Sequence, residues 1–136
     1  MPQMRTIDTG SASLRCAVEG DGPLVIMVHG FPESWYSWRH QIGPVADAGF
    51  TACAIDVRGY GGSDKPEPVG AYAMEHIAGD LVGLREALSP GAPAVLVGHD
   101  WGAPIVWNSA LTHPGHFRAV AGLSVPFAGV PNRPFT

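Results

Sequence analysis

The chain has 136 residues, of which 46% are hydrophobic and 15% charged, so it can bury the core of one domain. Its formal net charge of −4 and its lack of a basic cluster argue against nucleic acid or an anionic membrane as a partner. No apolar stretch approaches the roughly 20 residues that span a bilayer. Residues 1–6 lack the apolar core of a secretory signal, so we expect a cytoplasmic protein.

Short apolar segments alternate along the chain with stretches of helical periodicity. Strands are expected at residues 6–9, 13–18, 24–28, 50–55, 94–97 and 119–125. Apolar residues recur at helical spacing over residues 34–48, 73–88 and 105–111. This alternation predicts an α/β fold, a three-layer αβα sandwich built around a mostly parallel sheet.

The two cysteines, Cys16 and Cys53, each lie in a predicted strand. In a cytoplasmic chain such residues are expected to be buried apolar side chains rather than metal ligands. If their two strands are neighbours, a disulfide between them stays conceivable.

The most distinctive local pattern is the segment from Gly98 to Ala103, which places Asp100 between Gly98 and Gly102. A strand is predicted before this segment and a helix after it, which is the arrangement of a nucleophile elbow. In such an elbow the central residue occupies a strained turn above the carboxyl end of the sheet. The simpler alternative is that Asp100 caps the following helix.

Three segments follow predicted parallel strands, at the sheet edge where α/β proteins bind ligands. They are His-Gly-Phe-Pro-Glu-Ser-Trp at 29–35, Asp-Val-Arg-Gly-Tyr-Gly-Gly-Ser-Asp at 56–64 and Gly-His-Asp-Trp-Gly at 98–102. In this order they resemble the signature segments of α/β-hydrolase-fold epoxide hydrolases, over about residues 14–127. The resemblance implies that residues 1–136 form a partial core domain, the N-terminal part of this fold. It would end near Pro126, where a cap domain begins.

A carboxylate at the elbow suits displacement at a saturated carbon, which leaves an alkyl ester on the enzyme. The resemblance implies that Asp100 opens a small apolar epoxide, that water hydrolyses the ester, and that a vicinal diol is released. It assigns the oxyanion hole to the backbone N–H groups of Phe31 and Trp101. It also implies that Phe31, Pro32 and Trp101 line the substrate pocket, although both aromatic residues could be ordinary core residues, and that Pro32 follows a cis peptide bond. Neither a cofactor nor a metal ion is expected.

Other polar residues of the three segments are expected to be structural. His29 and His99 flank the site, but histidines beside such turns more often hold the backbone than react. The glycine-rich loop at residues 56–66 lacks the spacing of a phosphate-binding Walker A motif. Its charges are expected to hold the backbone of the loop itself.

A general base for ester hydrolysis is missing from the sequence. In this fold an acid and a histidine follow the nucleophile, yet after Asp100 there are only His113 and His116 and no Asp or Glu. Both histidines stand beside Pro114 at a helix end, so neither is expected to be the base. We therefore expect the chain alone to show no turnover, and to need a missing C-terminal half or to assemble as a homo-oligomer.

Two alternatives to an epoxide hydrolase remain open. Haloalkane dehalogenases use the same fold and nucleophile, and Trp101 fits them, but Phe31 stands where many carry Asn. Fluoroacetate-type dehalogenases match Phe31 but carry Arg at the position of Trp101. From another class, a non-catalytic remnant that acts as an interaction module would also lack the base.

Overall fold

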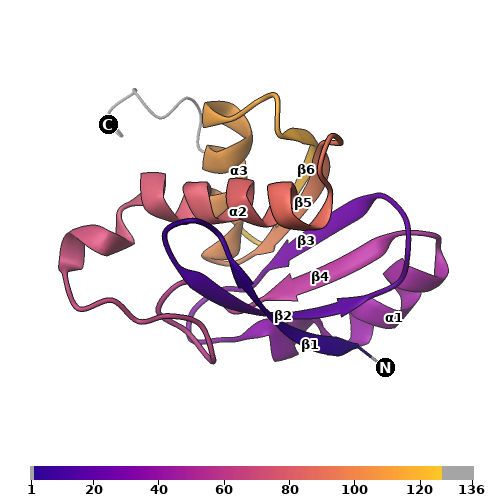
Figure 1. The fold of residues 1–136 in the computed structure, drawn as a ribbon, viewed down its shortest axis with the longest axis horizontal. Coiled ribbons are helices and arrows are strands. Elements are labelled where there is room, and N and C mark those ends of the chain that lie inside the picture. Colours follow the sequence, from indigo (N-terminus) through magenta and orange to yellow (C-terminus); the bar gives the residue numbers. More distant parts are fainter. Residues whose placement is uncertain (1, 127–136) are drawn as a thin grey trace.

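The computed structural model describes residues 2–126 as a single sheet with helices on both faces (Figure 1). Its strands are β1 (Gln3–Asp8), β2 (Ser13–Glu19), β3 (Leu24–Val28), β4 (Thr51–Ile55), β5 (Ala94–His99) and β6 (Phe117–Leu123). Its α-helices are α1 (Arg39–Asp47), α2 (Met74–Leu88) and α3 (Gly102–Thr112), and two short 3-10 helices, η1 (Trp35–Trp38) and η2 (Val69–Tyr72), precede α1 and α2.

The strands lie in the order β1-β2-β4-β3-β5-β6. The last four in this order are parallel to one another, and β1 and β2 form an antiparallel hairpin that pairs with β4. This arrangement confirms the predicted α/β class and the mostly parallel sheet. Because β4, β3 and β5 are neighbours, the three sequence segments that follow them meet at one edge of the sheet.

Two apolar cores cover the two faces of the sheet, as the predicted three-layer sandwich requires. Successive residues of β3 point to opposite faces. Ile26 packs with Leu81 of α2 and Val106 of α3, whereas Met27 packs with Ile42 of α1. All five residues of β3 are buried, since helices cover both of its faces.

Some boundaries differ from those expected. The helical stretch at 34–48 is divided into η1 and α1, because Ser34 caps a tight first turn by accepting the Tyr36 N–H at 3.3 Å. The last strand spans 117–123 rather than 119–125. It ends where Ser124 adopts a left-handed conformation (φ +71°), which extended backbone cannot contain.

Cys16 and Cys53 lie on the neighbouring strands β2 and β4, and both are fully buried free thiols. The expectation that they are apolar core residues is therefore confirmed. A hydrogen bond with Cys16, together with burial, raises the pKa of the Cys53 thiol well above its ordinary value.

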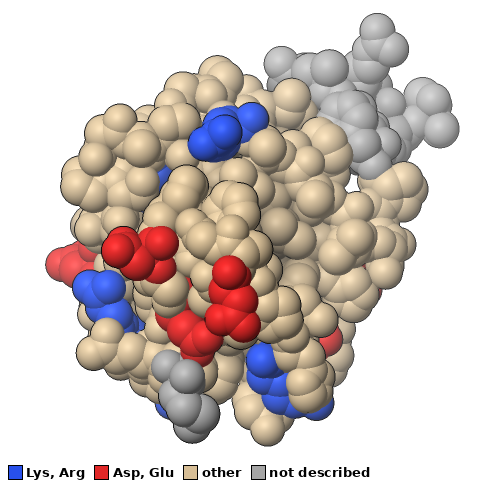
Figure 2. All heavy atoms as spheres, turned by 90° about the vertical axis from the view of Figure 1, so that its right-hand side faces the viewer, with Lys and Arg blue, Asp and Glu red and all other residues tan. Residues whose placement is uncertain are grey.

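Figure 2 shows the end of the molecule at which the parallel strands begin, where Lys and Arg are interspersed with Asp and Glu on a mostly uncharged surface. Among residues 2–126, no helix combines the length and the hydropathy needed to cross a membrane. The expected boundary with a cap domain falls at Pro126, and residues 127–136 lie outside the described part of the chain.

Candidate active site

The turn between β5 and α3 has the backbone of a nucleophile elbow. Asp100 has a φ of +57°, a left-handed conformation that non-glycine residues rarely adopt. The flanking glycines are required by close packing. A Cβ on Gly98 would lie 2.9 Å from the backbone nitrogen of Ala103, and one on Gly102 would lie 2.7 Å from the carbonyl oxygen of His29. The predicted Gly-x-Asp-x-Gly geometry is therefore present.

Asp100 does not cap α3. Trp101 occupies the N-cap position of that helix, and no side-chain hydrogen bond caps it. Instead, the partly buried Asp100 carboxylate accepts hydrogen bonds from the backbone N–H groups of Trp101 and of Phe31, the latter to Oδ2 at 3.2 Å. These two bonds, which favour the ionised form, lower the pKa of Asp100. The helix-cap alternative is wrong.

The Phe31 donor comes from a turn that follows β3. The Phe31–Pro32 peptide bond is cis, as the resemblance implied. The turn closes through the Glu33 N–H, which donates to the Gly30 carbonyl at 3.1 Å. A Cβ on Gly30 would lie 2.5 Å from the Cβ of Asp100, so only glycine allows this close approach.

His29 is buried beneath this turn and links two strands. Its Nδ1 lies 2.8 Å from the carbonyl oxygen of Gly30, and its Nε2 accepts the Val57 N–H at 3.0 Å. Because the carbonyl can only accept, the proton resides on Nδ1. Burial lowers the pKa of His29, which keeps the ring neutral. Both ring nitrogens hold backbone groups, in accord with the expected structural role.

The loop after β4 is held by its own buried charges. Asp56 Oδ1 accepts the Trp35 N–H and Oδ2 accepts the Gly62 N–H, at 2.8 and 2.9 Å. The carboxylate thus joins this loop to the segment that follows the Phe31 turn. The prediction that the charges of the loop serve its backbone is confirmed.

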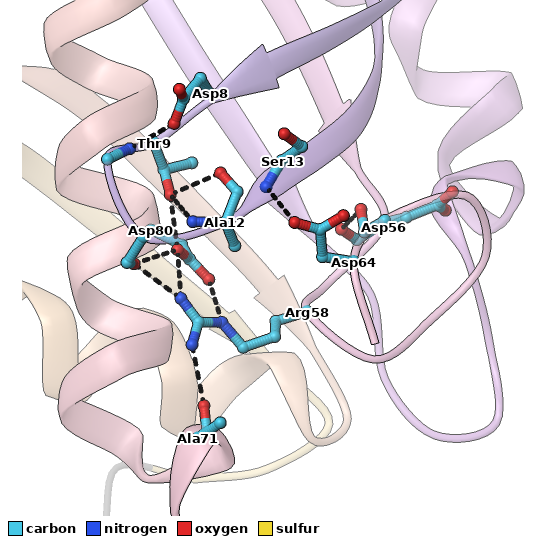
Figure 3. A network of polar contacts seen from close by, with 12 residues as sticks. Asp8, Thr9, Ala12, Ser13, Asp56, Arg58, Asp64, Ala71 and Asp80 are labelled. Atoms are coloured by element: carbon cyan, nitrogen blue, oxygen red, sulfur yellow. Dashed lines mark hydrogen bonds and ion pairs between the residues drawn. The ribbon is translucent and has the colours of Figure 1, made fainter. Parts of the chain in front are cut away.

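A second anchor of the same loop is the buried ion pair between Arg58 and Asp80 of α2 (Figure 3). Arg58 donates from Nε and Nη2 to the two oxygens of Asp80, at 2.8 Å each. Its Nη1 donates to the Ala71 carbonyl at 2.9 Å, and Thr9 Oγ1 donates to Asp80 Oδ1 at 2.7 Å. With all three guanidinium nitrogens occupied, Arg58 supports the loop and is not available to hold a ligand.

Two hollows are lined by the sequence neighbours of Asp100, Trp101 in one and His99 in the other, although Asp100 itself lines neither. An apolar hollow of about 340 Å³ is lined by Phe31 and Trp101 together with Val57, Arg58, Tyr60, Tyr72, Met74, Ile77 and Ile105. A more polar one of about 310 Å³ is lined by His29, Glu33, Ser37, Trp38, Gln41, His99 and Leu123. Phe31 and Trp101 are 62% and 65% exposed, so they are not core aromatics in this chain. Pro32 is not among the residues that line either hollow.

The two late histidines lie away from the elbow. His116 directly precedes β6 and bonds Arg85 at 2.9 Å, and His113 directly follows α3. Both are therefore at the amino end of the parallel strands, whereas Asp100 is at the carboxyl end. Within residues 2–126 there is also no cluster of three or more His, Cys, Asp or Glu residues that could hold a metal ion.

Glu33, for which the sequence predicted no role, is the residue that closes the Phe31 turn. Its carboxylate accepts the Gly30 N–H and the Ser37 hydroxyl, and it lies 3.7 Å from Nδ1 of His99. The only signal in the sequence is its position three residues after Gly30, a spacing that allows a side chain to bond the start of its own turn.

Known proteins resemble this chain in sequence and in fold. The family model for the alpha/beta hydrolase fold matches residues 23–135. Epoxide hydrolase A of Mycobacterium tuberculosis is 50% identical over 127 residues, which make up 92% of this chain and 39% of that protein. Epoxide hydrolase B of the same organism is 50% identical over 119 residues, 84% of this chain and 33% of that protein.

Solved structures give the same result. An epoxide hydrolase from an endophytic Streptomyces is 51% identical and superposes with a TM-score of 0.90, over 93% of this chain and 38% of that one. The chain thus spans about a third to two fifths of the length of these relatives. Since the family model covers most of the chain and the fold agrees throughout, the chain belongs to the α/β-hydrolase-fold family.

Proposed function

We propose that this chain carries the nucleophile of an epoxide hydrolase, which converts an epoxide and water into a vicinal diol through an ester on Asp100. The observation that carries the proposal is the carboxylate at the elbow, with Oδ2 held by the Phe31 N–H at 3.2 Å. A serine at this position would favour attack on a carbonyl carbon, whereas a carboxylate is suited to a strained saturated carbon. The epoxide hydrolase relatives support this choice.

In the first step Asp100 Oδ1 attacks one epoxide carbon, since Oδ2 is bonded to the turn. The carbon–oxygen bond of the ring breaks, and the oxygen that leaves takes up a proton from water and becomes the first hydroxyl of the diol. The backbone bonds that lower the pKa of Asp100 keep it ionised and ready to attack at neutral pH. Oδ2 then becomes the carbonyl oxygen of the ester.

In the second step water adds to the ester carbon, and negative charge develops on Oδ2. The N–H groups of Phe31 and Trp101 already face this carboxylate, so they can stabilise the charge without rearrangement. When the intermediate collapses, the diol leaves with the second hydroxyl and Asp100 is regenerated. This step needs a base, and we assign it to the part of the relatives' length that this chain does not span.

The apolar hollow beside Phe31 and Trp101 favours a neutral, apolar substituent on the epoxide. Its only charged lining residue is Arg58, whose nitrogens are bonded to Asp80, Ala71 and Ser11. An anionic tail would therefore find no available cation there.

A haloalkane dehalogenase is the second candidate, because the exposed Trp101 could offer its indole N–H to a departing halide. Against it, Phe31 presents an apolar ring where a second donor would be needed.

A chimera separates these candidates. Residues 1–126 would be joined to the complementary C-terminal part of M. tuberculosis epoxide hydrolase A and assayed with aryl epoxides and with haloalkanes. We expect the chimera to form diol, and we expect Asp100→Asn to lower the rate of diol formation by on the order of 10⁴-fold. Halide release without diol would favour the dehalogenase, and a folded chimera without either product would favour a non-catalytic remnant.

A further inference from the structure

Glu33 closes the turn that carries the Phe31 donor from both sides. Its backbone N–H donates to the Gly30 carbonyl at 3.1 Å, and its side-chain Oε1 accepts the Gly30 N–H at 2.9 Å. The same two residues therefore share two hydrogen bonds across Phe31 and Pro32.

Every backbone donor of this turn is accounted for. Gly30 donates to the Glu33 side chain, Glu33 donates to the Gly30 carbonyl, and Pro32 has no N–H. The remaining donor, Phe31 N–H, is directed at Asp100. Without the Glu33 carboxylate, the adjacent N–H of Gly30 would lose its partner, and the turn could rotate to satisfy it elsewhere.

The Glu33 carboxylate is itself held on two further sides. Ser37 Oγ, from η1, donates to Oε2 at 2.9 Å, and His99 Nδ1 lies 3.7 Å from Oε1. His99 immediately precedes Asp100, so Glu33 contacts both the turn and the elbow. Its side chain is only 28% exposed, unlike an ordinary surface carboxylate.

We propose that Glu33 is a positioning residue for the oxyanion hole: its carboxylate fixes the Phe31 turn against the elbow so that the Phe31 N–H meets Asp100 Oδ2. The inference rests on the proposed function for its catalytic consequence, although the positioning can be measured without turnover. Glu33 does not act on the substrate. It acts through the orientation of a neighbouring backbone donor.

The test compares four variants of the 136-residue chain. Glu33→Ala removes the acceptor, Glu33→Gln keeps an oxygen for the Gly30 N–H, and Ser37→Ala removes one of the donors that hold the carboxylate. Glu67→Ala, at an exposed loop position, is the matched control. NMR would follow hydrogen exchange of the Phe31 amide and the titration of the ¹³C-labelled Asp100 carboxyl group. Mass spectrometry would follow ester formation on Asp100 with an aryl epoxide.

In Glu33→Ala we expect faster exchange of the Phe31 amide, a pKa of Asp100 raised toward its ordinary value, and ester formation slowed by about 10-fold to 100-fold. Glu33→Gln should restore all three, Ser37→Ala should give a smaller change, and Glu67→Ala should match the unchanged chain. Should Glu33→Ala fail to fold, Glu33→Asp, whose shorter side chain cannot span the turn, should show the same changes in exchange and titration.

The proposal is overturned if the Phe31 exchange and the Asp100 titration in Glu33→Ala equal those in Glu67→Ala. It is also overturned if Glu33→Gln is as impaired as Glu33→Ala, because a side-chain acceptor for the Gly30 N–H would then not be what matters. If the unchanged chain forms no ester while exchange and titration respond to Glu33 as expected, the proposed function fails and the positioning role stands.

Discussion

Replacing Gly102 by alanine tests whether close packing at the elbow determines its sequence. The added Cβ would lie 2.7 Å from the carbonyl oxygen of His29 and closer still to that of Val28. Ordinary contact begins at 3.4 Å, so the start of α3 would have to move at least 0.7 Å away from β3. Both obstructing atoms are backbone atoms next to a buried strand, so they cannot swing aside as a flexible side chain can.

Overpacking of this kind typically costs about 1–3 kcal/mol and occasionally more. Alanine is favoured over glycine within a helix by about 1 kcal/mol, which offsets part of the cost. Because the added Cβ meets two backbone oxygens, we take the upper end of the overpacking range, about 3 kcal/mol. After the offset we expect Gly102→Ala to lower the free energy of unfolding by about 2 kcal/mol, which corresponds to a fall in Tm of roughly 8 °C for a chain of this size.

Gly79→Ala is the matched control, since it makes the same substitution within α2 where no atom lies within 4 Å of the added Cβ. There only helix propensity acts, and we expect a gain of about 0.5–1 kcal/mol. Urea unfolding followed by circular dichroism would measure both variants. If Gly102→Ala is as stable as Gly79→Ala, close packing is not the reason for glycine at position 102.

Three further changes test other parts of the structure. Arg58→Ala leaves Asp80 buried without its cationic partner and should lower the free energy of unfolding, measured in urea, by about 3–5 kcal/mol. The double variant Arg58→Met, Asp80→Leu should recover part of this stability. A loss in the double variant that equals or exceeds the loss in Arg58→Ala would contradict this expectation. Because burial lowers the pKa of His29, the unfolded chain binds a proton below about pH 6.5 that the folded chain does not. The free energy of unfolding should therefore fall between pH 7 and pH 5.5, by at most about 1.4 kcal/mol per pH unit, and His29→Asn should flatten this slope. Ala121 is exposed on the sheet-edge strand β6. Ala121→Lys should therefore weaken any concentration-dependent association of the chain seen by light scattering. Stronger association would show that another surface is involved.

Local patterns were sufficient to predict the elbow. The glycines at 98 and 102 bracket Asp100, a strand pattern precedes them and a helix pattern follows, and each of these signals lies within about 20 residues. The steric contacts explain why the pattern is informative: at both positions a Cβ would collide with backbone. Strand and helix boundaries were less predictable, because they depend on local conformations that hydrophobic periodicity does not indicate. Ser124 ends β6 by adopting a left-handed conformation, and Ser34 caps a tight 3-10 turn before α1.

Hydrogen bonds between distant segments could not be predicted in the same way. Asp56 bonds Trp35 across 21 residues, and Arg58 bonds Asp80 across 22. The sequence of one segment does not indicate which donor or acceptor of a distant segment it will bond, since that depends on the order of strands in the sheet. The contact of Glu33 with His99 was not predictable for a related reason, because it exists only when β3 and β5 pair side by side.

The central claim is that Asp100 is the nucleophile, and the most direct measurement is the mass of the chain after incubation with an aryl epoxide. We expect the addition of one epoxide mass on the peptide that contains Asp100. Hydroxylamine should remove the adduct, as it removes an ester, and Asp100→Asn should not form it. The adduct should persist, because His113 and His116 lie at the opposite end of the sheet. Modification of another carboxylate, or equal labelling of Asp100→Asn, would show that Asp100 is not the nucleophile.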